Sequence, residues 1–293
     1  KLSWSDEFSG TSLNDAYWTP QIGNGIEYGN RGWGNNEKEY YKAENVSVSN
    51  GTMKIKAQTE KTKANGTTYN WTSARITGTG KVNIGLGYVE AKIKIPSSKG
   101  IWPAFWMLGT NGKKWPACGE IDIMEAINAE NKTYGTCHWN VNGHAEYGKP
   151  TGNFDITQYH TYGLQWDNEY IRFFVDGNKF YEMSIANNVG DTDEFHRPFY
   201  LLLNVAVGGN WPGFSINDSA FPQEMKVDYV RVYQDNPSYN SSSSNNVDKS
   251  NGSNAGSSGN TGNTGNSGNN GSSSNTPASG MGMNYAGDSS ATA

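Results

Sequence analysis

Long apolar runs and clusters of basic residues are both missing from this sequence of 293 residues. No apolar stretch approaches the roughly 20 residues that a helix needs to cross a bilayer. The net charge of -5 and the lack of a basic run argue against nucleic acid or an anionic membrane as partner. The chain starts at Lys1 without a signal-like segment. We therefore expect a processed soluble protein, long enough for one large domain with a real core.

Cysteine is scarce, with Cys118 and Cys137 alone, too few for a disulfide framework. Cys118 shares strand parity with Glu120 and so should face the same way, whereas Cys137 has parity opposite to His138, so we expect two free thiols. Tryptophan and tyrosine are abundant instead, with 10 Trp and 17 Tyr against 10 Phe. Flat rings with polar atoms are suited to stacking on sugars, although ordinary core packing accounts for many of them.

Apolar residues alternate with a period of two far more often than they follow a helical period. Apolar residues alternate with lysine or glutamate in TMKIKAQ (52–58) and YVEAKIKI (88–95), which is typical of strands with one wet face. Further strand candidates are SARITGTG, GIWPAFWML, GEIDIMEA, YGTCHWNV, TYGLQW, YIRFFVDGNKFY, FYLLLNVAV and MKVDYVRVYQ. Many strands with glycine-rich joints and no long helix predict an all-β fold, an antiparallel two-sheet sandwich of about 235 residues.

The composition changes after Tyr239, where Asn, Ser, Gly and Thr take over. From Asp248 to Thr276 no apolar residue is larger than Ala255, so this stretch cannot bury a core and should be disordered. The sequence thus predicts a working domain over residues 1–235, a disordered linker over 236–280 and a short tail over 281–293.

The stretch GEIDIMEA (119–126) carries three carboxylates at an uneven spacing. In a flat strand Glu120 and Asp122 share a face, while Glu125 points into the opposite layer, where a lone buried carboxylate is costly. One extra residue, a β-bulge near Ile123-Met124, returns Glu125 to the first face. Two glutamates leaning inward can then approach the separation of about 5 to 5.5 Å that a retaining glycosidase needs. On spacing alone, solvated carboxylates at a strand edge remain an equal alternative.

Aromatic residues flank these acids. Trp102 and Trp106 lie just upstream, Trp115 precedes Glu120 by five residues, and His138 follows on the next predicted strand. This is the composition of a groove that holds a sugar, although each Trp alone is as well explained as a core or lid residue. His138 alone is better explained as a structural histidine, but an imidazole across the sheet could orient Asp122.

The strings WSDEF, GWGNNEKEYY, ITGTGKVNIGLGYVEAKIKIP, GIWPAFWMLG, WPACGEIDIME, CHW, FYLLLNVAVGGNWPG and MKVDYVRVYQ occur in this order. Together they resemble family sixteen of the glycoside hydrolases, in particular its bacterial laminarinase-type endo-β-1,3-glucanases. The resemblance covers residues 1 to 235. It implies a concanavalin-like β-jelly-roll sandwich with a substrate cleft on the concave sheet, with Glu120 as nucleophile, Glu125 as general acid/base and Asp122 as assisting carboxylate.

The same resemblance implies further site residues. Those that would line the glucan cleft are Asn36, Arg75, Trp102, Trp106, Trp115 and His138. A structural Ca²⁺, far from the cleft, would lie at Glu7, Gly51 and Asp228. From the residues alone these three positions are better explained as a turn-capping acid, an ordinary turn glycine and a solvated strand aspartate, because Ca²⁺ needs six or more oxygens.

The activity expected from the resemblance is double displacement on internal β-1,3-glucosidic bonds, without a catalytic cofactor. The partner would be a β-glucan, with neither nucleic acid nor membrane involved, and we expect a secreted monomer. One alternative is a mixed-linkage β-1,3-1,4-glucanase of the same family, and agarase activity fits the flanking strings less well. From another class, a non-catalytic glucan-binding module has no use for an acid and nucleophile pair, so the retained glutamates speak against it.

Overall fold

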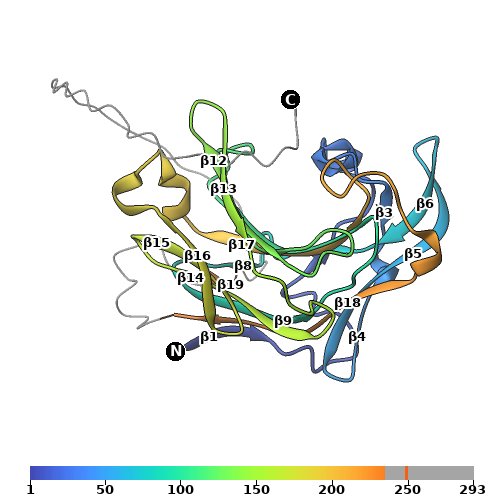
Figure 1. Cartoon of the computed structure of the whole chain (residues 1–293), viewed down its shortest axis with the longest axis horizontal. Helices are drawn as coiled ribbons and strands as arrows, with labels where there is room; N and C mark the ends of the chain where they lie inside the picture. The colour runs from blue at the N-terminus through green and yellow to red at the C-terminus, as the bar shows by residue number, and fades with distance from the viewer. Residues whose placement is uncertain (235–247, 250–293) are drawn as a thin grey trace, which may run out of the picture. The chain divides into compact units, whose positions relative to one another are not determined.

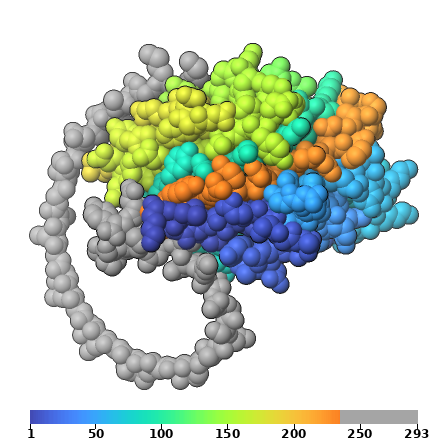
Figure 2. Space-filling view, turned by 90° about the horizontal axis from the view of Figure 1, so that it is seen from below, coloured from blue at the N-terminus to red at the C-terminus, as the bar shows by residue number. Residues whose placement is uncertain are grey.

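Two β-sheets packed face to face make up most of the chain that the computed structural model describes, residues 1–234 and 248–249 (Figure 1). The first sheet has ten strands. Its main order is β16 (Asn178–Ser184), β15 (Tyr170–Val175), β14 (Tyr159–Trp166), β9 (Gly87–Lys94), β18 (Gln223–Tyr233), β5 (Thr52–Ala64), β6 (Thr67–Ser73) and β3 (Glu39–Tyr41), with β1 (Leu2–Asp6) beside β18 and β4 (Val46–Ser49) beside β5. Figure 2 shows β1, in dark blue, alongside the orange β18.

The second sheet has seven strands and holds the acidic stretch. Its order is β13 (His144–Pro150), β12 (Tyr134–Asn140), β11 (Glu120–Glu125), β10 (Ile101–Gly109), β17 (Phe199–Val207), β7 (Arg75–Thr77) and β2 (Thr19–Pro20). A small pair joins β8 (Val82–Asn83) to β19 (Asp248–Lys249). Apart from β19, the predicted linker and tail lie outside the described residues.

Helical structure in the described part of the chain is limited to short 3-10 turns. They are η1 (Ile26–Tyr28), η2 (Arg31–Gly34), η3 (Ala43–Asn45), η4 (Ala186–Asn188), η5 (Thr192–His196) and η6 (Asp218–Ala220). None of the helices within residues 1–234 and 248–249 is long and apolar enough to cross a membrane.

The alternating residues of the sequence form the core between the sheets. Met53, Ile55 and Ala57 of β5 are fully buried, and the lysines between them reach the other face. Val89 and Ile93 of β9 are buried in the same way. Each apolar side chain removed from water contributes roughly 1.5 to 3 kcal/mol, so this alternation selects the face that turns inward. The predicted sandwich is confirmed.

One strand pair departs from the antiparallel prediction. β3 pairs with β6 in parallel, with Glu39 opposite Trp71. No tight turn joins these strands, because η3, β4 and β5 intervene between them. A connection of more than a dozen residues allows either direction, whereas a short hairpin would impose the antiparallel one.

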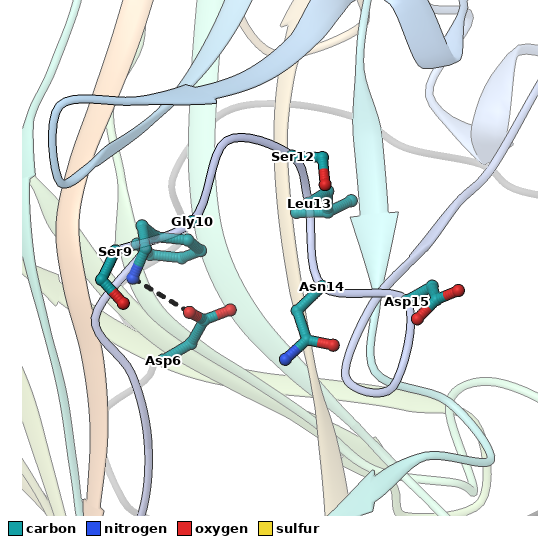
Figure 3. Close-up of a pocket in the computed structure, with 8 residues that line it drawn as sticks. Asp6, Ser9, Gly10, Ser12, Leu13, Asn14 and Asp15 are labelled. Carbon is teal, nitrogen blue, oxygen red and sulfur yellow. Dashed lines mark hydrogen bonds between the residues drawn. The ribbon is translucent and has the colours of Figure 1, made fainter.

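The N-terminal loop is held to the sandwich by Asp6. Its Oδ1 accepts the backbone N–H of Phe8 at 2.9 Å, and its Oδ2 accepts the indole N–H of the buried Trp18 at 2.9 Å. The loop bounds a hollow whose lining runs from Asp6 to Asp15 (Figure 3). None of the three clustered carboxylates lines it.

Candidate active site

The predicted bulge is present in β11, and it is centred on Ile123. Against β10, Asp122 pairs with Trp106 and Met124 pairs with Phe105, so Ile123 has no partner across the ladder. The pairing with β12 shifts over the same residues, between Asp122 and Glu125. An extra residue in one strand reverses the alternation beyond it.

The bulge places apolar and acidic residues on opposite faces. Ile121, Ile123 and Met124 all belong to the hydrophobic core, although the last two are adjacent in sequence. Glu125 is therefore on the face of Trp102, whose indole N–H donates to Glu125 Oε1 at 2.9 Å. The parity prediction for Glu120 and Glu125 is confirmed.

The carboxylates are not solvated edge residues. β11 lies inside the sheet, between β10 and β12. Asp122 is 3% exposed and Glu125 is 9% exposed, and the Glu120 side chain is 18% exposed. Clustering three acids away from water is unfavourable for folding, which favours a chemical role over a solubility role.

His138 lies across the strand from Glu120 and contacts two of the acids. Its Nε2 is 3.1 Å from Asp122 Oδ2, an ion-pair contact rather than an aligned hydrogen bond, and 3.9 Å from Glu120 Oε1. The imidazole therefore lies within ion-pair distance of Asp122, and its orienting role stays a prediction.

Burial and like charge raise the pKa values of all three acids. Loss of hydration and the Asp122 charge raise the pKa of Glu120 to about 8. Burial first, and then the charge of Asp122, raise the pKa of Glu125 well above its usual range. Burial also raises the pKa of Asp122 to about 8. Carboxyl groups with pKa values raised in this way retain protons at neutral pH. The cluster of three acids therefore contains a proton donor within reach of the groove.

The predicted cleft residues gather around these acids. Trp115 is 44% exposed and donates its indole N–H to Glu120 Oε2 at 3.0 Å. Trp106 donates to Asn204 Oδ1 at 2.7 Å. The Arg75 guanidinium lies 4.8 Å from the Trp106 ring and 4.3 Å from the ring of Trp33. The structure thus brings Arg75, Trp102, Trp106, Trp115 and His138 to one face with the acids.

Asn36 lies at the rim of this face, exposed to solvent. Its side chain donates to Asn210 Oδ1 at 2.9 Å, and the neighbouring Asn35 carbonyl accepts the Asn210 backbone N–H. Next to them, a Cβ at Gly209 would meet the Asn35 carbonyl and the Trp102 ring at 3.2 Å. The loop can therefore approach Trp102 closely only with glycine there.

Several residues of the site were missed in the sequence. Trp211 packs edge-to-face on Trp102, with ring centroids 5.6 Å apart. Asn204 donates to the hydroxyl of Tyr41, and this hydroxyl in turn donates to Glu37. These residues come from β17, β3 and their flanking loops, and the strings NVAVGGNWPG and NNEKEYY contain them without indicating their partners.

The cysteines are both free, as predicted, and both are buried. Cys118 belongs to the turn before β11 rather than to the strand. The strand-parity argument therefore does not apply to it.

Behind the cleft, Glu39 is buried without a cation. It is 0% exposed, and its Oε2 accepts the backbone N–H of Val207 at 2.6 Å. Burial and the neighbouring Glu37 charge raise its pKa well above the usual range. The folded chain therefore keeps a proton that the unfolded chain releases near pH 4.3, so this group lowers stability as pH rises above about 4.3.

Glu39→Gln should raise stability at neutral pH, because a neutral amide retains the acceptor for Val207 and never has to ionise. We expect the gain to grow from about pH 5 to about pH 8, by at most about 1.4 kcal/mol per pH unit. Urea unfolding at the two pH values measures it, with exposed Glu44→Gln as matched control. A gain that is equal at both pH values would contradict a buried protonated Glu39.

Two of the three positions predicted for calcium have cationic partners. Both carboxylate oxygens of Glu7 accept from Arg231, at 2.9 and 2.8 Å. Asp228 Oδ2 is 2.9 Å from Lys92 Nζ. Side chains so paired do not fit a calcium site unless both ion pairs break, because Ca²⁺ requires free oxygens. Calcium at Glu7, Gly51 and Asp228 stays a prediction.

Comparison with known proteins agrees with this geometry. Residues 2–235 match the family model described as the GH16 domain of β-porphyranases A to D. The chain is 40% identical over 240 residues to the clotting factor G alpha subunit of Tachypleus tridentatus and 35% identical over 257 residues to glucan endo-1,3-beta-glucosidase A1 of Niallia circulans. Each alignment covers 80% of this chain, which spans only 34% and 38% of those two proteins.

A solved structure extends the comparison to the fold. The laminarinase catalytic domain of Thermotoga maritima superimposes with a TM-score of 0.74 at 40% identity, covering 80% of this chain and 98% of that one. The family match spans nearly the whole described sandwich, including the bulged strand and its three acids. The chain therefore belongs to glycoside hydrolase family 16.

Proposed function

We propose that this chain is an endo-acting, retaining glycoside hydrolase that cleaves internal β-1,3-glucosidic bonds of laminarin-type β-glucans. The observation that carries the proposal is the bulge at Ile123, which puts Glu120, Asp122 and Glu125 on one face of the sheet. Half-buried and exposed tryptophans border this face and offer flat surfaces for sugar rings.

In this proposal Glu125 is the general acid. Its raised pKa keeps it protonated, and the Trp102 N–H fixes Oε1. Glu125 gives its proton to the leaving glycosidic oxygen while Glu120 attacks the anomeric carbon. The bond to the leaving oxygen breaks and a glycosyl ester with Glu120 forms. Ionised Glu125 then takes a proton from water, whose oxygen displaces Glu120.

Trp115 and His138 support the nucleophile. The Trp115 N–H and the nearby His138 each lower the pKa of Glu120, against the larger effect of burial. Asp122 lies between the glutamates, and its charge contributes to keeping the proton on Glu125. Burial and Asp122 raise the pKa of both glutamates, and each glutamate accepts one indole N–H. They differ in exposure, because Glu125 is buried and Glu120 is partly exposed.

The β-1,3 preference is supported by the names of two relatives, a glucan endo-1,3-beta-glucosidase and a laminarinase. The matching family model is named for porphyranases, so porphyran belongs among the substrates to be compared. Secretion and a monomeric state remain part of the proposal.

The configuration of the first product tests the mechanism. We expect the β-anomer to appear first when laminarin is hydrolysed, because double displacement inverts the anomeric carbon twice. Proton NMR during the first turnovers, before mutarotation, measures it. Initial α-anomer would overturn the role of Glu120 as nucleophile.

Substrate comparison tests the linkage. Reducing-sugar assays on laminarin, lichenan, barley β-glucan and porphyran should give the highest rate on laminarin. A higher rate on lichenan would indicate the mixed-linkage alternative, and a higher rate on porphyran a galactanase. Binding of laminarin without any reducing sugar would indicate a non-catalytic module.

A further inference from the structure

The hairpin of β12 and β13 gathers three further side chains next to the acids. His138 lies directly across from Glu146, and His144 pairs with Asn140 two residues along, so all three project from one face. His138 Nδ1 is 2.8 Å from His144 Nε2 and 3.6 Å from Glu146 Oε2. His144 Nε2 is 3.8 Å from the same Glu146 oxygen.

These distances match the edges of a small coordination polyhedron. Ligand atoms about 2.1 Å from a tetrahedral ion lie about 3.4 Å from one another. The three atoms are therefore spaced so that one ion can contact all of them after shifts of a few tenths of an ångström. Two imidazoles and one carboxylate are a ligand set that Zn²⁺ prefers, with a fourth position left for water.

We propose that His138, His144 and Glu146 form a binding site for Zn²⁺ or a similar divalent transition metal ion on the β12–β13 hairpin, beside the carboxylate cluster. His138 binds through Nδ1, His144 through Nε2 and Glu146 through Oε2. This site is separate from the calcium position considered above.

The surroundings of His138 supply a second, independent observation. A histidine that binds a metal ion through one ring nitrogen usually donates its other N–H to a carboxylate, which fixes the ring and its tautomer. His138 Nε2 is in ion-pair contact with Asp122 Oδ2, 3.1 Å away, and Asp122 is almost completely buried. Nδ1 faces His144 and Glu146, and a bound ion would replace its 2.8 Å contact with His144 Nε2.

Packing and access also suit an ion. The ring of Trp115 packs against His144, tilted by 46° with centroids 4.6 Å apart, and so restricts the His144 ring. The Glu146 side chain is 52% exposed and the His144 side chain 30%, which leaves a path from solvent. Without metal, one proton shared between the two histidines accounts for their 2.8 Å contact.

A second set of possible metal ligands also includes His138. Glu120, Asp122 and His138 also offer three ligand atoms close together. An ion there would use His138 Nε2 in place of Nδ1 and would depend on Glu120. Variants that alter only one of the two ligand sets distinguish the two placements of the ion.

Titration calorimetry with ZnCl₂ on the metal-free full chain tests the site. We expect one ion per chain for the wild type. His144→Gln and Glu146→Gln each remove a direct ligand and should weaken binding by more than the roughly tenfold to hundredfold that loss of an outer-shell partner costs. His196→Gln, which removes a histidine far along the sequence in η5, should leave the zinc affinity unchanged. The visible absorption of bound Co²⁺ should report four-coordination in the wild type and disappear in both variants.

Both hairpin variants change exposed side chains, and circular dichroism verifies their fold. Absence of stoichiometric zinc binding by the wild type would overturn the site. Unchanged affinity in His144→Gln and Glu146→Gln, together with a loss in Glu120→Gln, would place the ion on the carboxylates and would equally overturn it. Neither result depends on glucan hydrolysis.

Discussion

Glu120→Gln and Glu125→Gln should each lower kcat on laminarin by several orders of magnitude, with little change in the affinity for laminarin oligosaccharides. The amides keep the size of the side chains and an acceptor oxygen for the N–H groups of Trp115 and Trp102. They remove the nucleophile and the proton donor, which act only in the transition state. Single-turnover kinetics and calorimetry on the same preparations measure the two effects.

An activated substrate distinguishes the two roles. An aryl β-glucoside oligomer with a nitrophenolate leaving group needs no proton to depart, so Glu125→Gln should regain most of its first step and Glu120→Gln none. The exposed Glu44→Gln is the control for a generic loss of charge. Near-normal laminarin turnover by either active-site variant would refute its assigned role.

Deleting Met124 should destabilise the sandwich by several kcal/mol and still leave the three acids on one face. Without the extra residue β11 runs flat, and Glu120, Asp122 and Glu125 then follow one another with a period of two. Glu125 keeps its place opposite Ala104, so hydrolysis should persist. The core loses Met124, and removal of a buried side chain of this size costs about 2 to 5 kcal/mol. Urea unfolding and a reducing-sugar assay measure stability and hydrolysis.

Met124→Leu is the matched control. It keeps the residue count and nearly the volume, so we expect a cost below about 1.5 kcal/mol and unchanged turnover. A folded deletion variant that releases no sugar would contradict this realignment of β11.

The features that the sequence could predict are those set by neighbouring residues. Alternation in β5 and β9 predicts their buried faces, because each strand places every second residue inward. The bulge follows from the cost of burying Glu125 alone. In contrast, the chain from Trp106 through Asn204 to Tyr41 depends on the pairing of β10 with β17 and the approach of β3. Such contacts between residues far apart in sequence have no local signal, and neither does the parallel pairing of β3 with β6.

Because Trp115 is exposed, its fluorescence can report on the site. All ten tryptophans lie within the described residues. Trp115, at 44%, is the most exposed of them. Its indole N–H is hydrogen-bonded to Glu120 and its ring packs at a tilt against His144. Acrylamide should therefore quench Trp115 emission before that of the buried indoles, and a ligand lying over the ring should shield it. The protein thus carries an intrinsic fluorophore through which occupancy of the groove can be followed without a label.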